Sequence, residues 1–229
     1  MYYLSILMMF LLGSMTNCTT QKAVSTSAEL QKTVSDTLKP RITKKKKYDT
    51  KQWTNVIEAS PSIGLDIRYA TPNNFTKAKI YDCAACYLRP AVAAALAKAH
   101  ENLQKQGLGI KVFDCYRPRP YQQRLWDKVP NPDYVTPPAK GSMHNRGMAI
   151  DLTIVDKNGK ELEMGTPYDF FGEKAHHDYD KLPKDIQANR TLLLKTMEQF
   201  GFKHIRTEWW HYSFEGNLYD FSDWVWECE

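Results

Sequence analysis

Apolar residues recur at helical spacing in two stretches of the chain. In residues 90–106 the apolar side chains on one face are Val92, Leu96, Ala99 and Leu103. Pro90 suits the first turn of a helix, and Gly107 is a typical residue just beyond the last turn. In residues 183–200 the apolar side chains on or near one face are Ile186, Leu193, Met197 and Phe200, and Gly201 follows. The pattern therefore predicts two amphipathic helices.

Four shorter stretches have the composition or the alternation of strands. Residues 110–115, 202–205 and 209–214 are rich in β-branched and aromatic side chains. Residues 148–153 alternate, so Asp151 is expected on the opposite face from Met148, Ile150 and Leu152. Because helices and strands do not alternate regularly, we expect an α+β fold rather than a doubly wound one. The predicted architecture is a single domain with a mostly antiparallel central sheet flanked by helices.

The first fifty residues differ in composition from the rest of the chain. Residues 2–12 form an apolar run that is short for a membrane span and has the length of the apolar core of an export signal. Cys18 follows at a distance that resembles the lipid-attachment cysteine of bacterial lipoproteins. Residues 19–50 are rich in Ser, Thr, Gln and Lys. We expect a signal peptide or lipoprotein signal at residues 1–18, a flexible tether at residues 19–50 and the folded domain at residues 51–229.

Positive charge is concentrated in the same N-terminal part. Residues 1–48 carry eight Lys or Arg and two Asp or Glu, a net charge of +6, so the remaining residues sum to −1 within the total of +5. A domain without excess positive charge is not expected to bind nucleic acid. The lysine run at residues 44–47 fits a solvated linker, with contact to anionic lipid as the alternative.

The number of cysteines is consistent with the export that residues 1–18 predict. Apart from Cys18 the chain has four, an even number that fits disulfides in an oxidising envelope compartment, and they are Cys83, Cys86, Cys115 and Cys228. Three pairings are open, and buried free thiols are an equal alternative. A structural zinc site at residues 83–86 would need a second closely spaced pair, which the chain lacks. We predict export to the periplasm or the cell envelope, as an outer-membrane lipoprotein if Cys18 is acylated.

The segment 142–151 holds the first candidate metal ligands. Asp151 would be the one charged group on a largely apolar strand, and a buried carboxylate needs a partner. His144 could share a metal ion with it, because Gly147 lets the chain fold back between the two. For this segment alone, a salt-bridged Asp151 and a loop histidine remain an equal interpretation.

The segment 208–211 supplies a second carboxylate and a second imidazole. Glu208 and His211 are three residues apart, so on a regular strand they would face opposite ways. Glu208 must therefore lie at the entry of the strand, or a bulge must turn it, if both are to address one ion. His211 would be the third ligand and Glu208 the general base that activates water. Arg117, at a strand end beside Pro118, could stabilise an oxyanion, although a lone arginine is more often a surface residue.

These segments resemble the VanX-type D-alanyl-D-alanine dipeptidases, a zinc peptidase family shared with VanY-type D,D-carboxypeptidases and Hedgehog-type domains. The resemblance covers most of residues 53–221. The stretches that carry it are residues 65–71, 74–75, 114–118, 142–153, 164–170 and 208–212. Each motif alone is weakly specific, but their joint order is strongly so.

The resemblance implies roles for seven residues. It assigns one zinc ion per chain to His144, Asp151 and His211, with Glu208 as the catalytic base and Arg117 as the transition-state arginine. It also implies that Ser142 helps hold the carboxylate of the substrate and that Asp169 holds its free amino group. An anion that pairs with an ammonium favours a short peptide with a free N-terminus. The remaining histidines are assigned to hydrogen bonding or to the surface, and they are His100, His176, His177 and His204.

We therefore predict an exported zinc metallopeptidase that hydrolyses the D-alanyl-D-alanine dipeptide. Its expected partners are the small D,D-dipeptide and, through a lipidated Cys18, a membrane. No nucleic acid and no obligate protein partner are expected. Two alternatives stay open: a D,D-carboxypeptidase that acts on peptidoglycan stem peptides, and a non-catalytic zinc-bearing envelope binding module. A module that only binds has no use for a base at Glu208, which argues against the second alternative.

Overall fold

A five-stranded sheet organises residues 47–228, the part of the chain that the computed structural model describes. Its strand order is β2-β4-β5-β7-β6; β2 and β4 run parallel, and every other neighbouring pair is antiparallel. A separate antiparallel pair joins β1 to β3. The expected α+β fold with a mostly antiparallel sheet is confirmed. The predicted signal at residues 1–18 and most of the predicted tether lie outside the described residues.

The elements of this part of the chain are as follows. The strands are β1 (Thr54–Asn55), β2 (Gly64–Leu65), β3 (Tyr87–Leu88), β4 (Leu108–Asp114), β5 (Ala149–Asp156), β6 (Phe202–Ile205) and β7 (Glu208–Phe214). The α-helices are α2 (Val56–Ala59), α3 (Pro90–Gln104), α4 (Arg119–Lys128) and α5 (Lys184–Gln199). Short 3-10 helices are η1 (Arg68–Ala70), η2 (His144–Arg146) and η3 (Glu173–Ala175).

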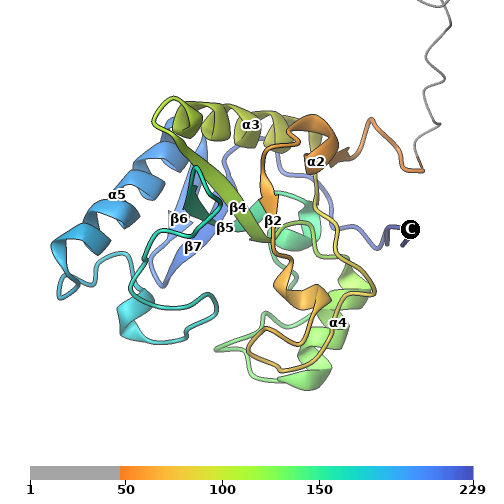
Figure 1. Ribbon diagram of the computed structural model, residues 1–229. Helices are drawn as coiled ribbons and strands as arrows, with labels where there is room; N and C mark the ends of the chain where they lie inside the picture. Colours follow the sequence, from red (N-terminus) through yellow and green to blue (C-terminus); the bar gives the residue numbers. More distant parts are fainter. Residues whose placement is uncertain (1–46, 229) are drawn as a thin grey trace, which may run out of the picture. The chain divides into compact units, whose positions relative to one another are not determined.

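The two predicted helices, α3 and α5, pack against each other and against the sheet (Figure 1). The face of α3 expected to be apolar is buried, and each helix is followed by a glycine with a left-handed backbone, Gly107 or Gly201. Helix α4 was not expected from the sequence; its mostly polar residues bury only Tyr121, Gln122 and Leu125. No helix within residues 47–228 has the length and apolar character needed to cross a membrane.

The central strand β5 is buried along almost its whole length. Its alternation places the apolar side chains of Ile150, Leu152 and Ile154 on one face and Asp151 on the other. The neighbouring strands fix what lies beside Asp151: in register it is opposite Asp114 of β4 and His211 of β7. The sheet therefore gathers polar groups from three strands at one place in an otherwise apolar interior.

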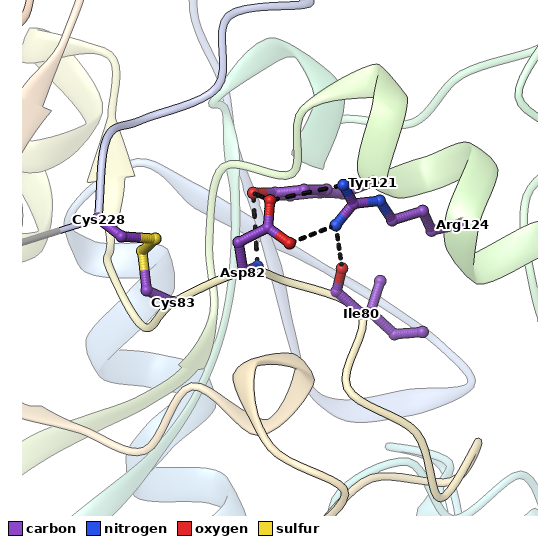
Figure 2. Close-up of a disulfide and its surroundings, with 6 residues drawn as sticks. All are labelled: Ile80, Asp82, Cys83, Tyr121, Arg124 and Cys228. Carbon is purple, nitrogen blue, oxygen red and sulfur yellow. Dashed lines mark hydrogen bonds and ion pairs between the residues drawn. A yellow bond between two sulfur atoms is a disulfide. The ribbon is translucent and has the colours of Figure 1, made fainter.

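One disulfide, between Cys83 and Cys228, joins the loop before β3 to the segment after β7 (Figure 2). Beside it, Asp82 accepts hydrogen bonds from the Tyr121 hydroxyl, at 2.9 Å, and from the Arg124 guanidinium, at 2.7 Å. The other two cysteines, Cys86 and Cys115, are buried free thiols. Burial raises the pKa of the Cys115 thiol well above its ordinary value, so it stays protonated. The disulfide interpretation is therefore correct for Cys83 and Cys228, and the interpretation as buried free thiols is correct for Cys86 and Cys115.

Loss of this disulfide should destabilise the domain measurably. The bond spans 145 residues, and closing so long a loop restricts the unfolded chain, which is typically worth about 2–4 kcal/mol. We expect the Cys83→Ala/Cys228→Ala variant to lose about that much free energy of unfolding in a urea titration. Reductant should destabilise the wild-type domain equally and leave the variant unchanged. A further loss of free energy of unfolding when reductant is added to the variant would contradict the assignment of the disulfide to Cys83 and Cys228.

Candidate active site

Three predicted metal ligands converge on the side of β5 that carries Asp151. His144 opens η2, Asp151 lies in β5 and His211 lies in β7. The Nε2 of His144 is 3.2 Å from the Nδ1 of His211 and 3.4 Å from the Oδ1 of Asp151, and that oxygen is 2.9 Å from the Nδ1 of His211. Two ligands bound to a tetrahedral zinc ion at 2.0–2.1 Å are about 3.3 Å apart. The three atoms therefore fit one face of a zinc coordination tetrahedron.

A glycine makes this convergence sterically feasible. Gly147 connects η2 to β5 with a φ of 70°, in the left-handed region that favours glycine. A Cβ at this position would lie 2.5 Å from a ring atom of Trp53, so a larger residue would also clash. The chain therefore folds back between His144 and Asp151 as expected, and Gly147 makes this possible.

Each ligand has a further contact that orients it. The Nδ1 of His144 donates to the backbone carbonyl of Cys115 at 2.7 Å, which leaves Nε2 unprotonated on a neutral ring. The Nε2 of His211 lies 3.1 Å from the Oγ of Ser213, a partner that suits the tautomer with a free Nδ1. The Oδ2 of Asp151 accepts from the hydroxyl of Tyr168 at 2.9 Å. These contacts leave the Nε2 of His144, the Oδ1 of Asp151 and the Nδ1 of His211 as the three atoms available to one metal ion.

The charge of Asp151 is stabilised by its neighbours. Burial by itself would raise its pKa, but the imidazoles of His144 and His211 reverse this and hold the pKa of the carboxyl well below its usual range. Asp151 is therefore an anion at every pH at which the protein works. An anionic oxygen with two imidazole nitrogens is a common donor set for catalytic zinc, and the residues present fit that ion.

Glu208 lies at the edge of this cluster, where a general base is expected. It is the first residue of β7, and the pairing of β6 with β7 shifts register between His204 and Ile205, next to it. The spacing of Glu208 and His211 called for one of two features, a position at the entry of the strand or a bulge, and Glu208 lies at the entry beside an irregularity in the pairing. The Oε2 of Glu208 is 4.0 Å from the Nδ1 of His211, and its side chain is 27% exposed. Burial raises the pKa of Glu208 above its ordinary value, which makes the carboxylate a stronger base.

Arg117 is buried rather than on the surface. Its Nη2 donates to the Oδ2 of Asp114 at 2.6 Å, and its Nη1 donates to the Oε1 of Gln122 at 3.0 Å. Its Nε lies 3.2 Å from both Asp114 and the Tyr81 hydroxyl. These contacts fix the plane of the guanidinium and leave two of its five N–H groups without a partner among them. Arg117 lines the cavity that holds the metal ligands.

The two residues assigned to the ends of the substrate line the same cavity. Asp169 has a left-handed backbone, with a φ of 59°, and accepts a hydrogen bond of 3.0 Å from the Tyr69 hydroxyl. Burial, then the nearby charge of Asp151, raises the pKa of Asp169 well above its ordinary value, and the charge of Arg117 offsets this only in part. Ser142 precedes η2 in the chain, and its Oγ is 3.3 Å from the Oδ1 of Asn145.

The cavity has a volume of about 230 Å³. All seven predicted site residues line it: Arg117, Ser142, His144, Asp151, Asp169, Glu208 and His211. Three large apolar side chains that also line it are partly exposed, Tyr134 at 48%, Phe171 at 38% and Ile205 at 38%, and others are buried, among them Leu125, Val135 and Trp210. The arrangement suits a small ligand with charged ends, because the cavity presents several charged groups among apolar ones.

The other histidines stay out of the cluster, as expected. His100 accepts from the backbone N–H of Ile110, and His204 lies 3.1 Å from Glu198. His176 contacts Arg206, whereas the buried Nε2 of His177 has no hydrogen-bond partner. Within residues 47–228, one group of three His, Cys, Asp or Glu side chains could hold a metal ion, and it is the predicted one.

Four contributors to the site were not identified from the sequence. They are Tyr69, Tyr81, Asp114 and Tyr168, each of which contacts a predicted site residue by a hydrogen bond. Tyr69, Asp114 and Tyr168 lie inside the motifs that carried the family resemblance, and Tyr168 directly precedes Asp169, which did receive a role. Their position inside those motifs was the available signal, but sequence does not tell which partner a hydroxyl meets.

Known proteins of one family are similar to this chain over most of its described length. The family model described as D-ala-D-ala dipeptidase, in peptidase family M15, matches residues 49–224. A D-alanyl-D-alanine dipeptidase of Escherichia coli is 38% identical over 164 residues, which cover 72% of this chain and 85% of the relative. One of Enterococcus faecium is 33% identical over 181 residues, which cover 70% and 90%.

Among solved structures, the vancomycin-resistance D,D-pentapeptidase VanY in complex with Zn(II) is 16% identical, with a TM-score of 0.39, and the match covers 57% of this chain and 74% of that one. The family model spans well over half of the chain, and the two dipeptidases are each more than 30% identical to it. The chain therefore belongs to the D-Ala-D-Ala dipeptidase family of M15 metallopeptidases.

Proposed function

We propose that this protein hydrolyses the D-alanyl-D-alanine dipeptide in the cell envelope, with one zinc ion per chain held by His144, Asp151 and His211. The observation that carries the proposal is the convergence of these three ligand atoms, 2.9–3.4 Å from one another, with the carboxylate of Glu208 beside them. Membership of the dipeptidase family supports the same substrate.

Proton transfer in this proposal belongs to Glu208. A bound zinc ion would supply Lewis acidity, which polarises a carbonyl and lowers the pKa of water. Glu208 takes the proton from the attacking water and later delivers it to the leaving amine. The partial burial of its side chain supports this role, because a carboxylate with a raised pKa holds a proton more readily until the amine departs.

Stabilisation of the tetrahedral oxyanion is assigned to Arg117. Its guanidinium is held by Asp114, Tyr81 and Gln122, and it lines the cavity from a fixed position. A donor that is already oriented needs no rearrangement when charge develops on the substrate, and this pre-organisation is the source of its effect. The ion pair with Asp114 also keeps the buried cation compensated while no substrate is bound.

The two ends of the dipeptide are assigned to Asp169 and Ser142. Burial and the charge of Asp151 disfavour the ionised form of the Asp169 carboxyl, and a substrate ammonium beside it would stabilise that form. The Ser142 hydroxyl, which lines the same cavity, would donate to the substrate carboxylate. A volume of about 230 Å³ suits a substrate with two small side chains.

Export to the periplasm or cell envelope, with Cys18 as the acylated residue, is part of the proposal. Its support is the apolar run at residues 2–12 and the position of Cys18 after it. The disulfide between Cys83 and Cys228 also supports an oxidising compartment, because such bonds are rare in the cytosol.

Replacement of the base tests the proposed chemistry. We expect the wild-type protein to contain one zinc ion per chain and to hydrolyse D-Ala-D-Ala, with activity lost on treatment with a chelator. Glu208→Gln should retain zinc, measured by elemental analysis, but lower kcat by roughly a hundredfold or more, because general base catalysis contributes about that much. His204→Gln, a change outside the cavity, is the control. Full activity in Glu208→Gln would remove the proposed base.

A blocked N-terminus tests the role of Asp169. N-acetyl-D-Ala-D-Ala has no ammonium to pair with this carboxylate, so its kcat/KM should be at least about a hundredfold below that of the free dipeptide. Asp169→Asn should lower kcat/KM for the free dipeptide far more than for the acetylated one. Comparable cleavage of both peptides by the wild-type protein would favour a D,D-carboxypeptidase instead, and zinc binding without hydrolysis would favour a binding module.

A further inference from the structure

The two oxygens of Asp151 have different surroundings. Oδ1 faces the imidazoles, 2.9 Å from the Nδ1 of His211 and 3.4 Å from the Nε2 of His144. The other oxygen, Oδ2, accepts a hydrogen bond of 2.9 Å from the hydroxyl of Tyr168. A phenol is protonated at neutral pH, so Tyr168 is the donor of this bond. One oxygen is thus free for a metal ion, and the other is already engaged.

The ring of Tyr168 is held on several sides, so its hydroxyl cannot easily turn away. Its centroid lies 4.9 Å from that of Phe113, 5.5 Å from that of Trp210 and 6.3 Å from that of Tyr69. These rings come from β4, β7 and η1, which are separate parts of the fold. A side chain packed by three elements loses little further freedom when it forms a hydrogen bond, so the bond is effective at fixing its partner.

We propose that Tyr168 is a positioning residue that holds Asp151 as a ligand through one oxygen only and so keeps a coordination position of the zinc ion open. This inference rests on the proposed function, because it assumes that zinc is bound by His144, Asp151 and His211. A carboxylate without this restraint can rotate and bind through both oxygens. It would then occupy the position that the reaction needs for water or substrate.

The backbone beside Tyr168 extends the consequence to substrate binding. Asp169, the next residue, adopts a left-handed φ of 59°, a conformation that is costly outside glycine and is retained where the surroundings enforce it. Two consecutive side chains can therefore both reach the site: Tyr168 contacts Asp151, and Asp169 contacts Tyr69 in the cavity. The restraint on the metal ligand and the group assigned to the substrate ammonium belong to a single turn of the chain.

Tyr168→Phe tests the proposal because it removes only the hydroxyl. We expect zinc affinity, measured by competition with a chromophoric chelator, to fall by about 10–100-fold, the usual effect of losing a partner of a metal ligand. The absorption spectrum of the Co(II)-substituted variant should shift toward that of a higher coordination number. The melting temperature of the metal-free protein should change little, because the ring and its packing remain.

Tyr212→Phe is the matched control. Tyr212 is buried in β7 next to His211, and its hydroxyl has no hydrogen-bond partner among residues 47–228, so its loss should leave zinc affinity unchanged. An affinity loss below tenfold in Tyr168→Phe, an equal loss in Tyr212→Phe, or an unchanged Co(II) spectrum would overturn the proposal. Any of these results with a wild-type protein that binds zinc would overturn this inference alone. A wild-type protein that bound no zinc would overturn the proposed function as well.

Discussion

The pairing of β5 with β7 is the constraint on which the site depends. Its register places Asp151 directly opposite His211, so two of the three predicted metal ligands are neighbours across one strand pair. Backbone hydrogen bonds along both strands enforce that register, and a slip by a single residue would turn one of the two side chains to the opposite face of the sheet. The third predicted ligand, His144, needs only the short η2 and the turn at Gly147 to reach them. The relative position of two predicted ligands is therefore set by the sheet itself.

Around this pairing the fold gathers more carboxylates than an apolar interior tolerates unaided. Asp114 and Asp151 are opposite each other on neighbouring strands, and both are almost fully buried. Each has its own compensation: Asp114 pairs with Arg117, and Asp151 contacts two imidazoles. Asp169 accepts a hydrogen bond from the Tyr69 hydroxyl, but burial and the charge of Asp151 disfavour its ionised form, and Arg117 offsets this only in part. A substrate with a positive end would stabilise that charge, which links the electrostatics of the cavity to selectivity.

The sequence predicted the parts of this molecule that depend on local patterns. The alternation at residues 148–153 identified β5 and placed Asp151 on the face opposite its apolar neighbours. The spacing of Glu208 and His211 called for either a position at the strand entry or a bulge, and Glu208 is the first residue of β7, beside an irregularity in the β6–β7 pairing. Helix α4 escaped detection because its polar sequence lacks an apolar stripe, and the partner of Cys83 could not be chosen because pairing depends on distances across the fold. The hydroxyls that orient the site, such as that of Tyr168, were missed for the same reason: a hydrogen bond between distant residues leaves no periodicity in the chain.

The disulfide has a consequence for how the molecule matures. Cys83 precedes and Cys228 follows all seven predicted site residues in the chain, so the covalent loop encloses them, whereas Tyr69 and Tyr81, which contact two of them, lie before Cys83. During synthesis the bond can close only after the last of the seven, His211, has been made. Oxidation therefore restricts a chain in which every predicted site residue is already present.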